Sequence, residues 1–320
     1  MRVAVIGSGF GARVVAPVYA ATAGCTVVGV VSARDERAVA ALCARPDVDL
    51  VSVHSPPFLH AAHVQAALDA GHAVLCDKPF GLDAADATAM LDAAEAAGRV
   101  HLVNFELRHV PMRRRMRDLV CDGAVGRVEH VQWTHLSTGS RVPLRPYGWL
   151  FDRSLGGGWI GAWGSHAVDT VRWIFGPIVA ARAECRVTIA ERPDREGTMR
   201  RCDAEDAFTA TLRTESGATV AIDTSFVAAA PLAPRIAVLG SDGVLECVDD
   251  RRIVLRRADG TRDEIDTPPS SGDRHDEPMR RWAEIVRDAV HDGAAPPGAP
   301  TFVDGVACVR VLDELRRGRP

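Results

Sequence analysis

Short apolar runs alternate with Ala-rich helical segments through residues 1–120, and this alternation restricts the fold more than any other feature of the chain. Apolar runs separated by helices are typical of parallel strands joined by crossover helices. The segment after Asp83 shows the expected punctuation, since Asp83 is an N-cap candidate and Gly98 is placed to end the helix. We therefore expect a doubly wound parallel sheet. Its expected strands are 2–6, 26–31, 49–53, 73–76 and 100–104.

A different pattern begins after about residue 125. Residues 127–266 are predicted to form successive strands, apart from a helical stretch near 158–175, and their short turn sequences imply a mainly antiparallel sheet. Helical patterns return at about 277–291 and 303–317. The predicted fold class is α/β plus α+β, with an N-terminal Rossmann doubly wound parallel sheet and a C-terminal domain that has a large, mainly antiparallel sheet and flanking helices.

The 320 residues are enough for two domains, each with its own core. We expect a dinucleotide-binding domain at 1–122 and a substrate-binding and oligomerisation domain at 123–320. The last helix, at about 303–317, is a candidate to pack back on the N-terminal domain.

Charge and cysteine usage exclude several classes of function. A formal net charge of −4 gives no reason to expect nucleic acid or an anionic membrane as a partner. The 8 cysteines form no CxxC pair and show no metal-ligand spacing, which predicts buried apolar residues in a reducing compartment and no metal site. No apolar stretch is long enough to span a bilayer and no leader-like segment precedes the first strand, so we expect a cytoplasmic location.

The segment "VAVIGSGFGARVVAP" carries a GxGxxA pattern at Gly7, Gly9 and Ala12, directly between a strand and a helix. Glycine permits a tight turn and the close approach of backbone to a pyrophosphate, and the N-terminus of the following helix favours an anion. This position predicts a dinucleotide-binding turn, in which we also place Phe10. The alternative is a glycine-rich turn without a ligand.

The end of the second strand indicates which dinucleotide is bound. An acid at this point usually holds the ribose 2′-hydroxyl of NAD, whereas an arginine accommodates the 2′-phosphate of NADP. The sequence has Ser32 at the expected position, followed by Arg34 and Arg37, and we therefore favour NADP(H) over NAD(H). Asp35 is the counterargument, because a shift of one turn would bring its carboxylate to the ribose.

Lys78, in "CDKPFG", is the single lysine among 38 Lys and Arg residues. An arginine stays charged, whereas a lysine ammonium is compact and can lose its proton when it is desolvated. A site that needs a small, titratable cation would not accept arginine, which makes Lys78 a candidate catalytic residue. The alternative is that one lysine has survived by chance.

Four segments together resemble the Gfo/Idh/MocA family, the glucose–fructose oxidoreductase and inositol dehydrogenase group. They are the glycine turn at 7–12, "SPPFLHAAHVQAALDAGHAVLCDKPFG" at 55–81, "NFELRHVP" at 104–111 and "WLFDRSLGGGWIGAWGSHAVD" at 149–169. The resemblance covers nearly the whole chain. Its second and fourth segments are together more specific than the glycine turn alone.

By this resemblance, Lys78 points at the junction of nicotinamide and substrate, where its ammonium donates a hydrogen bond to the reacting oxygen. Asp77 would fix the approach of the lysine and belongs to the cofactor-binding set. His60 has a plain alternative as a surface residue of the following helix. The other cofactor-binding residues that the resemblance implies are Ser55, Pro56 and His60.

The fourth segment departs from the family pattern. Dehydrogenases of the family typically have three glycines, then an Asp, a His four residues later and a second Asp three residues beyond. This chain keeps 156–158, His166 and Asp169 but has Ala162 at the first Asp position. The resemblance makes His166 the catalytic residue that handles the proton, and Asp169 at i+3 can hold it in place of the missing carboxylate. The alternative is a core histidine packed among tryptophans.

The same resemblance implies a substrate pocket, in which Tyr147 is an auxiliary acid. Because an exposed arginine or a packed tryptophan needs no functional reason, each of its residues has a structural alternative. In the family the C-terminal sheet often mediates self-association, so we expect a homo-oligomer, a dimer or tetramer, formed through it. The substrate-binding residues expected are Arg108, Tyr147, Trp149 and Asp169.

These features predict an NAD(P)-dependent oxidoreductase of the CH–OH donor type, which transfers hydride between nicotinamide and a carbinol or carbonyl carbon of a sugar, cyclitol or related polar small molecule. Ala162 leaves room for a less hydroxylated substrate, such as a ketone or imine of specialised metabolism. Two alternatives of other classes stay open: a hydrolase or lyase that uses NAD for transient oxidation, and a non-catalytic NAD(P)-binding regulator.

Overall fold

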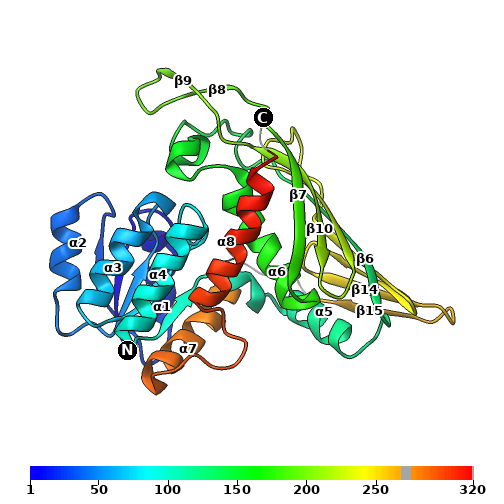
Figure 1. Cartoon of the computed structure of the whole chain (residues 1–320), viewed down its shortest axis with the longest axis horizontal. Coiled ribbons are helices and arrows are strands. Elements are labelled where there is room, and N and C mark those ends of the chain that lie inside the picture. Colours follow the sequence, from blue (N-terminus) through cyan, green and yellow to red (C-terminus); the bar gives the residue numbers. More distant parts are fainter. Residues whose placement is uncertain (268–274, 319–320) are drawn as a thin grey trace. The chain divides into compact units, whose positions relative to one another are not determined.

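The computed structural model describes residues 1–267 and 275–318, which fall into two compact units (Figure 1). Unit 1 comprises Met1–His109 and Gly272–Arg310, and unit 2 comprises Val110–Ser271 and Val311–Pro320. A C-terminal segment of the chain therefore belongs to unit 1. The functional division expected at 1–122 and 123–320 stays a prediction.

Unit 1 is built on a five-stranded parallel sheet in the order β2-β1-β3-β4-β5. This order confirms the predicted doubly wound sheet, since the direction of winding reverses between β1 and β3. The strands are β1 (Arg2–Ile6), β2 (Thr26–Val31), β3 (Leu50–Val53), β4 (Ala73–Cys76) and β5 (His101–Val103). The helices that belong to it are α1 (Ala16–Ala21), α2 (Glu36–Cys43), α3 (His60–Asp69), α4 (Ala84–Ala97), α7 (Asp276–Asp292) and the first part of α8 (Phe302–Arg316).

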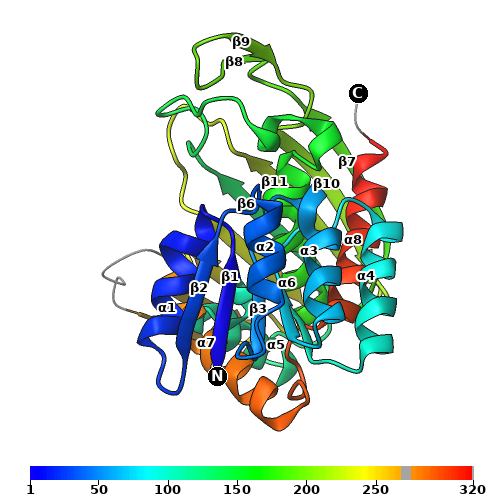
Figure 2. The ribbon, with the colours of Figure 1, turned by 90° about the vertical axis from the view of Figure 1, so that its left-hand side faces the viewer.

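Helices cover both faces of this sheet. Alternate strand residues such as Val5 and Leu75 pack on one face against Tyr19 of α1 and Trp282 of α7, all fully buried. Helices α2, α3 and α4 form the layer on the opposite face, where they stand in a row (Figure 2). The β-strands are therefore buried on both sides, as expected for a parallel sheet.

The ends of α4 follow the signals predicted for them. Asp83 is the N-cap, and its carboxylate accepts hydrogen bonds from the N–H groups of Ala85 and Asp86 at 3.0 and 2.9 Å. Gly98 closes the helix with φ +60°, a left-handed conformation that suits glycine.

Unit 2 is built on an eight-stranded sheet in the order β15-β14-β13-β12-β6-β11-β10-β7. The neighbours β6 and β11 are parallel and the other pairs are antiparallel, which confirms the predicted mainly antiparallel sheet. The strands are β6 (Val128–Leu136), β7 (Ile178–Arg186), β10 (Ala207–Thr214), β11 (Thr219–Ser225), β12 (Arg235–Gly240), β13 (Gly243–Val248), β14 (Arg252–Arg257) and β15 (Arg262–Asp266). A separate hairpin consists of β8 (Glu191–Pro193) and β9 (Met199–Arg201).

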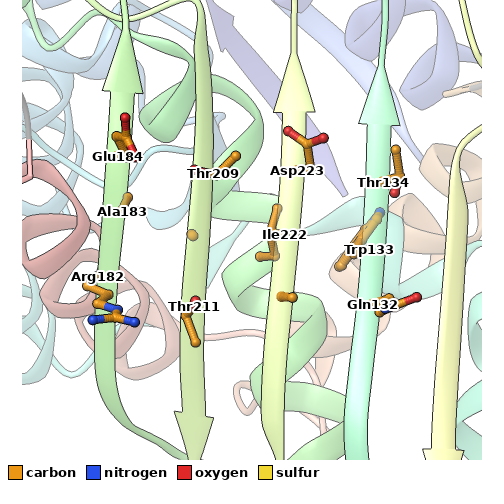
Figure 3. Close-up of a pocket in the computed structure, with 12 residues that line it drawn as sticks. Gln132, Trp133, Thr134, Arg182, Ala183, Glu184, Thr209, Thr211, Ile222 and Asp223 are labelled. Atoms are coloured by element: carbon orange, nitrogen blue, oxygen red, sulfur yellow. The ribbon is translucent and has the colours of Figure 1, made fainter.

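The two faces of the large sheet differ. Helices α5 (Pro111–Cys121) and α6 (Ser165–Phe175) lie on one side of it (Figure 1). The outward side chains of β7, β10, β11 and β6 line an open groove, where Glu184, Thr209 and Asp223 form one row because they are register partners (Figure 3). None of the residues predicted for catalysis or cofactor binding is among those that line this groove.

Residues 1–267 and 275–318 contain neither a membrane-spanning helix nor a group of metal ligands. None of their helices has both the length and the apolar composition needed to cross a bilayer. No three of their His, Cys, Asp and Glu side chains gather as metal ligands would.

Candidate active site

The glycine turn leaves β1 and enters a π-helical segment, Gly11–Val15, that continues into α1. Gly7 has φ +140°, and a Cβ there would come within 2.5 Å of the carbonyl oxygen of His54, so only glycine fits. At Gly9, in contrast, a Cβ would meet nothing within 4 Å. The turn is tight on its protein side and open at Gly9, and it therefore fits the pyrophosphate of the predicted dinucleotide. Ala12 is half-buried within the segment that follows.

Phe10 and Gly11 tie the turn to its surroundings. The Phe10 ring contacts the rings of His54 and His275 edge-on, with centroids 5.9 and 5.5 Å apart. A Cβ on Gly11 would lie 3.0 Å from His54 Cβ and 3.1 Å from Val5 Cγ1. The GxGxxA pattern assigned the third small residue to Ala12, whereas the close packing falls on Gly11.

The residues after β2 present positive charge to solvent. Ser32, Arg34 and Arg37 are exposed, and neither arginine has a carboxylate of a described residue within ion-pair distance. The Asp35 carboxylate is the N-cap of α2 and accepts the N–H of Ala38 at 3.0 Å. Asp35 therefore has a structural task, while the two arginines remain available to an anion.

The loop after β3 is held by two histidines of α3. His60 Nε2 donates to the Ser55 carbonyl oxygen at 2.8 Å, and His63 Nδ1 lies 3.0 Å from Ser55 Oγ. Burial lowers the pKa of His60, and it lowers the pKa of His63 to about 4. Pro56 follows in an extended conformation. The surface alternative for His60 is wrong, because its side chain has no exposed area, and it braces the Ser55 loop.

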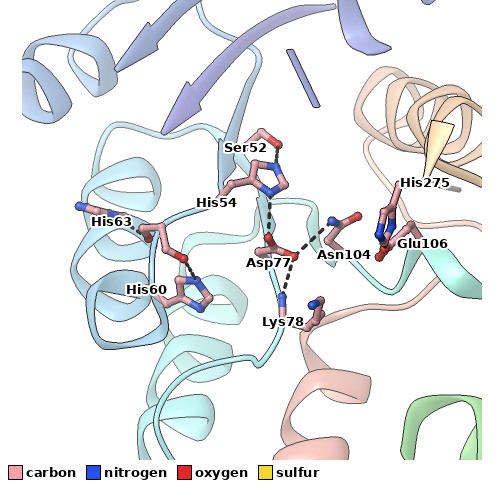
Figure 4. Close-up of polar contacts among 10 residues, drawn as sticks. Ser52, His54, His60, His63, Asp77, Lys78, Asn104, Glu106 and His275 are labelled. Carbon is pink, nitrogen blue, oxygen red and sulfur yellow. Dashed lines mark hydrogen bonds and ion pairs between the residues drawn. The ribbon is translucent and has the colours of Figure 1, made fainter. Parts of the chain in front are cut away.

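Asp77 organises the end of β4 (Figure 4). Its Oδ1 accepts hydrogen bonds from the backbone N–H of Lys78 at 2.9 Å and from Asn104 Nδ2 at 3.2 Å, while its Oδ2 lies 3.2 Å from His54 Nδ1. Burial alone would raise the pKa of Asp77, but the hydrogen bond and charge of His54, together with the Lys78 ammonium, outweigh burial and lower it. The Lys78–Pro79 peptide bond is cis.

His54 extends this chain of polar contacts into β3, because its Nε2 lies 2.7 Å from Ser52 Oγ. The His54 side chain and Ser52 have no exposed area. His54 is not among the site residues predicted from the sequence. The signal that could have found it is a histidine that directly follows an apolar strand, at the carboxyl edge where the glycine turn and Lys78 also lie.

A second buried pair lies after β5. Glu106 is 1% exposed and accepts a hydrogen bond from His275 Nδ1 at 3.0 Å (Figure 4). His275 is the N-cap residue of α7 and also contacts the Phe10 ring. Because Glu106 and His275 are far apart in the sequence, no short sequence motif could predict the pair.

Arg108, a predicted substrate-binding residue, is 4% exposed and is engaged within unit 1. Its guanidinium donates to Asp304 Oδ1 at 3.0 Å and to the Gly298 carbonyl oxygen at 3.3 Å. It also lies over the Phe105 ring. These contacts join the segment after β5 to the start of α8, and the substrate role of Arg108 stays a prediction.

In unit 2 the three-glycine turn leads into the helical run that carries His166. Gly157 packs against three backbone carbonyl oxygens of the preceding turn, which leaves no space for a side chain. Gly158 makes room for the carboxylate of Glu205, and Glu205 Oε1 accepts the N–H of Ile160 at 3.0 Å. The turn thus lets a buried carboxylate cap the start of the helix.

Ala162 lies in a π-helical segment, Ile160–Gly164, and His166 lies in the first turn of α6. Between Gly157 and Val171, Ala162 is the one residue that is not fully buried. His166 and Asp169 are 5% and 3% exposed. The position where the family pattern has Asp is therefore the open point of an otherwise buried run, and the roles of His166 and Asp169 stay predictions.

Ala162 shares a hydrophobic cluster with aromatic side chains. Tyr147, Trp149, Phe226 and Ala162 all pack against one buried cluster of Leu150, Phe151 and Cys202. The Tyr147 hydroxyl donates to Asp152 Oδ2 at 3.1 Å; burial, then this carboxylate, raises the pKa of Tyr147 to about 12. The Tyr147 hydroxyl is therefore engaged by Asp152 within unit 2, and its role as an auxiliary acid stays a prediction.

Two models of one family match this chain. The oxidoreductase family with an NAD-binding Rossmann fold matches residues 1–105, and the GFO/IDH/MocA C-terminal domain matches residues 113–246. The chain belongs to the Gfo/Idh/MocA oxidoreductase family.

Several curated relatives are sugar or cyclitol dehydrogenases by name. Inositol 2-dehydrogenase 3 of Saccharopolyspora erythraea is 29% identical over 303 residues, which is 92% of this chain and 82% of that protein. The levoglucosan dehydrogenase of Pseudarthrobacter phenanthrenivorans is 33% identical over 153 residues, or 48% of this chain and 39% of that protein. An uncharacterised oxidoreductase of Synechocystis is 36% identical, and the chain spans 41% of its length. The chain thus spans about two fifths of the length of these last two relatives.

Solved Gfo/Idh/MocA structures share the whole fold. A levoglucosan dehydrogenase in complex with NADH and levoglucosan superposes with a TM-score of 0.87 at 23% identity, covering 99% of this chain and 96% of that one. An oxidoreductase domain protein from Kribbella flavida has a TM-score of 0.84 at 25% identity, with the same coverage of both chains. The predicted N-terminal Rossmann sheet and C-terminal mixed sheet are confirmed by this likeness.

Proposed function

We propose that the chain is an NAD(P)-dependent oxidoreductase of the CH–OH donor type, acting on a carbinol or carbonyl carbon of a sugar, cyclitol or related polar metabolite. The observation that carries this proposal is Lys78, the single lysine of the chain, held directly after β4 by the Asp77 carboxylate at 2.9 Å. Ligands of open α/β sheets bind outside the carboxyl ends of the strands, and Lys78 lies at that edge. The names of the family relatives support the substrate class.

The residues proposed to hold the dinucleotide follow β1, β2 and β3. The backbone of Gly7 and Gly9 would receive the pyrophosphate, and Ser55 and Pro56 would follow the nicotinamide half. Arg34 and Arg37 support NADP(H) over NAD(H), because they are exposed and the competing Asp35 caps α2. When bound, the nicotinamide supplies or accepts the hydride. The remaining members of the proposed cofactor-binding set are Phe10, Ala12, Ser32, His60, Asp77 and Lys78.

Two side chains carry the proposed proton chemistry. Lys78 Nζ donates a hydrogen bond to the oxygen on the reacting carbon and thereby stabilises its developing charge. His166 takes the proton during oxidation and returns it during reduction, with Asp169 as its partner. General acid–base help of this kind is worth about 10²- to 10⁴-fold in rate.

A second candidate within the same reaction class is the reduction of a ketone or imine of specialised metabolism. The observation that favours it is the apolar surroundings of Ala162, where Trp149, Tyr147 and Phe226 gather on one cluster. An alanine among aromatic rings offers no partner for a substrate hydroxyl.

We also propose self-association through the open face of the large sheet. Its groove displays acidic, basic and hydroxyl side chains on neighbouring strands, including Glu184, Asp223 and Arg182 (Figure 3). A mixed row of this kind can pair with a second copy of itself across a two-fold axis. Sedimentation of the purified chain would show a single species of monomer mass if this part of the proposal is wrong.

The decisive experiment incubates purified chain with NADP(H) or NAD(H) and a panel of sugars, cyclitols and ketones, and follows nicotinamide absorbance together with product formation. Stoichiometric conversion of cofactor and substrate supports the proposal. Product formation without net cofactor conversion would instead identify a hydrolase or lyase with transient oxidation. Cofactor binding without any product would identify a regulator.

A further inference from the structure

His54 lies between the glycine turn and the end of β4, and it contacts both. Its ring meets the Phe10 ring, and its Cβ would lie 3.0 Å from a Cβ on Gly11. On the other side, its Nδ1 lies 3.2 Å from Asp77 Oδ2. The side chain has no exposed area, so this imidazole acts entirely on protein groups.

The chemistry of the Asp77 carboxylate decides the direction of its hydrogen bond with His54. A carboxylate only accepts, so His54 Nδ1 carries a proton and donates it to Asp77. On the other side of the ring, Nε2 lies 2.7 Å from Ser52 Oγ, a hydroxyl that can donate or accept. One ring thus binds the strand on one side and orients the carboxylate on the other (Figure 4).

The two carboxylate oxygens of Asp77 have different hydrogen-bond partners. Oδ2 faces His54, which leaves Oδ1 to accept the Lys78 N–H at 2.9 Å and the Asn104 amide at 3.2 Å. If Oδ2 lost its donor, the carboxylate could rotate about its bond to Cβ, and Oδ1 would leave the Lys78 N–H. The orientation of the Lys78 backbone therefore depends on the hydrogen bond between His54 and Asp77.

We propose that His54 is a positioning residue for Lys78, which acts by holding Asp77 in the rotamer that fixes the Lys78 backbone. This inference rests on the proposed function, in which Lys78 contacts the substrate oxygen. The competing explanation is that His54 only fills space beneath Gly7 and Gly11. The two explanations differ in which nitrogen of the ring matters.

Two amide variants distinguish the roles of Nδ1 and Nε2 of His54. The Asn side chain places its NH₂ group near the position of His Nδ1, so His54→Asn keeps the donor to Asp77 and loses the contact with Ser52. The Gln side chain reaches the position of Nε2, so His54→Gln keeps a partner for Ser52 and loses Asp77. His72 offers a matched control, because its buried Nε2 donates to the Cys43 carbonyl oxygen at 2.7 Å next to the opposite end of β4.

The single lysine makes a direct readout available. Growth on ¹⁵N-lysine labels one backbone amide in this chain, that of Lys78, provided any added tag lacks lysine. The position and exchange rate of that NMR resonance report the hydrogen bond to Asp77 without any turnover. In parallel, kcat and KM are measured on the substrate that the panel identifies, and the Kd for the dinucleotide is measured by fluorescence titration.

The proposal expects His54→Asn to keep the Lys78 resonance and most of kcat. It expects His54→Gln to shift the resonance, speed its exchange and lower kcat by about 10- to 100-fold with KM and the dinucleotide Kd changed less than about threefold. His72→Asn should leave the resonance in place. A His54→Gln resonance at the wild-type position, or a His54→Asn resonance displaced as far as that of His54→Gln, overturns the proposal. If His54→Gln does not fold, a His54→Asn resonance displaced from the wild-type position overturns the proposal.

The NMR comparison also separates this proposal from the function on which it rests. If the chain turns over none of the substrates but shows the expected resonance pattern, the positioning of Lys78 by His54 is supported. The proposed oxidoreductase activity is then wrong. If the wild-type enzyme is active and the resonance is unchanged in His54→Gln, the oxidoreductase activity is supported. The positioning role of His54 is then wrong.

Discussion

Gly158 lies against the carboxylate of Glu205 with no room for a side chain between them. Its φ is +113°, and a Cβ would collide with Glu205 Oε1, the atom that accepts the N–H of Ile160 at 3.0 Å. A third glycine therefore has to stand where a buried acid caps the helical run that carries Ala162 and His166.

Gly158→Ala should destabilise unit 2, because the added methyl group displaces the cap and the left-handed backbone is strained. We expect the free energy of unfolding to fall by about 2 to 4 kcal/mol in urea denaturation. Gly217→Ala is the matched control, since Gly217 also has a positive φ of +92° but a Cβ there would meet nothing within 4 Å. Equal losses in the two variants would show that backbone strain alone is responsible.

The buried His63 should make the fold sensitive to mild acid. The unfolded side chain titrates near pH 6.5, while burial lowers the pKa of the folded side chain to about 4. Between these values the unfolded chain binds a proton that the folded chain excludes, so stability falls as pH drops through this window, by up to about 3 kcal/mol. Urea denaturation at about pH 7 and pH 5 should show a smaller difference for His63→Asn than for wild type. His291→Asn, at an exposed histidine, should leave that difference unchanged.

Lys78→Arg should abolish most of the proposed turnover. A guanidinium is planar and cannot replace a compact ammonium at the substrate oxygen. We expect kcat to fall by about 10²- to 10⁴-fold in steady-state assays with NADP(H). Retention of most of the wild-type kcat would remove Lys78 from its proposed role.

The double variant Arg34→Ala/Arg37→Ala should lose its preference for NADP(H). Each arginine is exposed at the end of β2 and offers charge to a 2′-phosphate. We expect the Kd for NADP(H) to rise by about 10-fold or more, which is about 1.4 kcal/mol, while the Kd for NAD(H) stays nearly constant. Arg281→Ala, on the exposed side of α7, is the control. A parallel change for both dinucleotides would contradict a 2′-phosphate contact.

Ala162→Asp should raise activity on polyols, because the new carboxylate would stand at the open point of the buried run and accept from a substrate hydroxyl. Trp149 and Tyr147 would remain in place beside it. Measured kcat/KM on a cyclitol should increase, while that on a simple ketone should fall. No gain on any polyol would show that Ala162 does not face the substrate.

Much of the fold was predictable because local signals and burial agree. The strands at 26–31 and 73–76 match β2 and β4 in both bounds, since each is an apolar run closed by polar residues. Asp83 and Gly98 bound α4 as their capping chemistry predicts. The return of the chain to unit 1 through α7 was not predictable. An amphipathic pattern indicates that one face of a helix is buried, but not which sheet that face covers.

The candidate site divides in the same way. Lys78 stood out by residue type alone, and the glycine turn by its place after a strand. His54, Glu106 and His275 did not, because each histidine and its acidic partner lie 23 or more positions apart and only tertiary packing brings them together. The close packing of Gly11 was missed for a similar reason, since the nearest neighbour that excludes a side chain, His54, lies in the loop after β3.

Unit 1 is completed late in synthesis. Trp282 of α7 closes the sheet face formed by Val5 and Leu75, yet it follows the last strand of that sheet by about 180 residues. At about 5 to 20 residues per second, the part of this apolar face that α7 covers stays exposed for roughly 10 to 40 seconds of synthesis. A chain released after residue 122 would keep all five strands and never receive its cover. Until α7 emerges, the apolar side chains that Trp282 later covers stay open to water and to other chains.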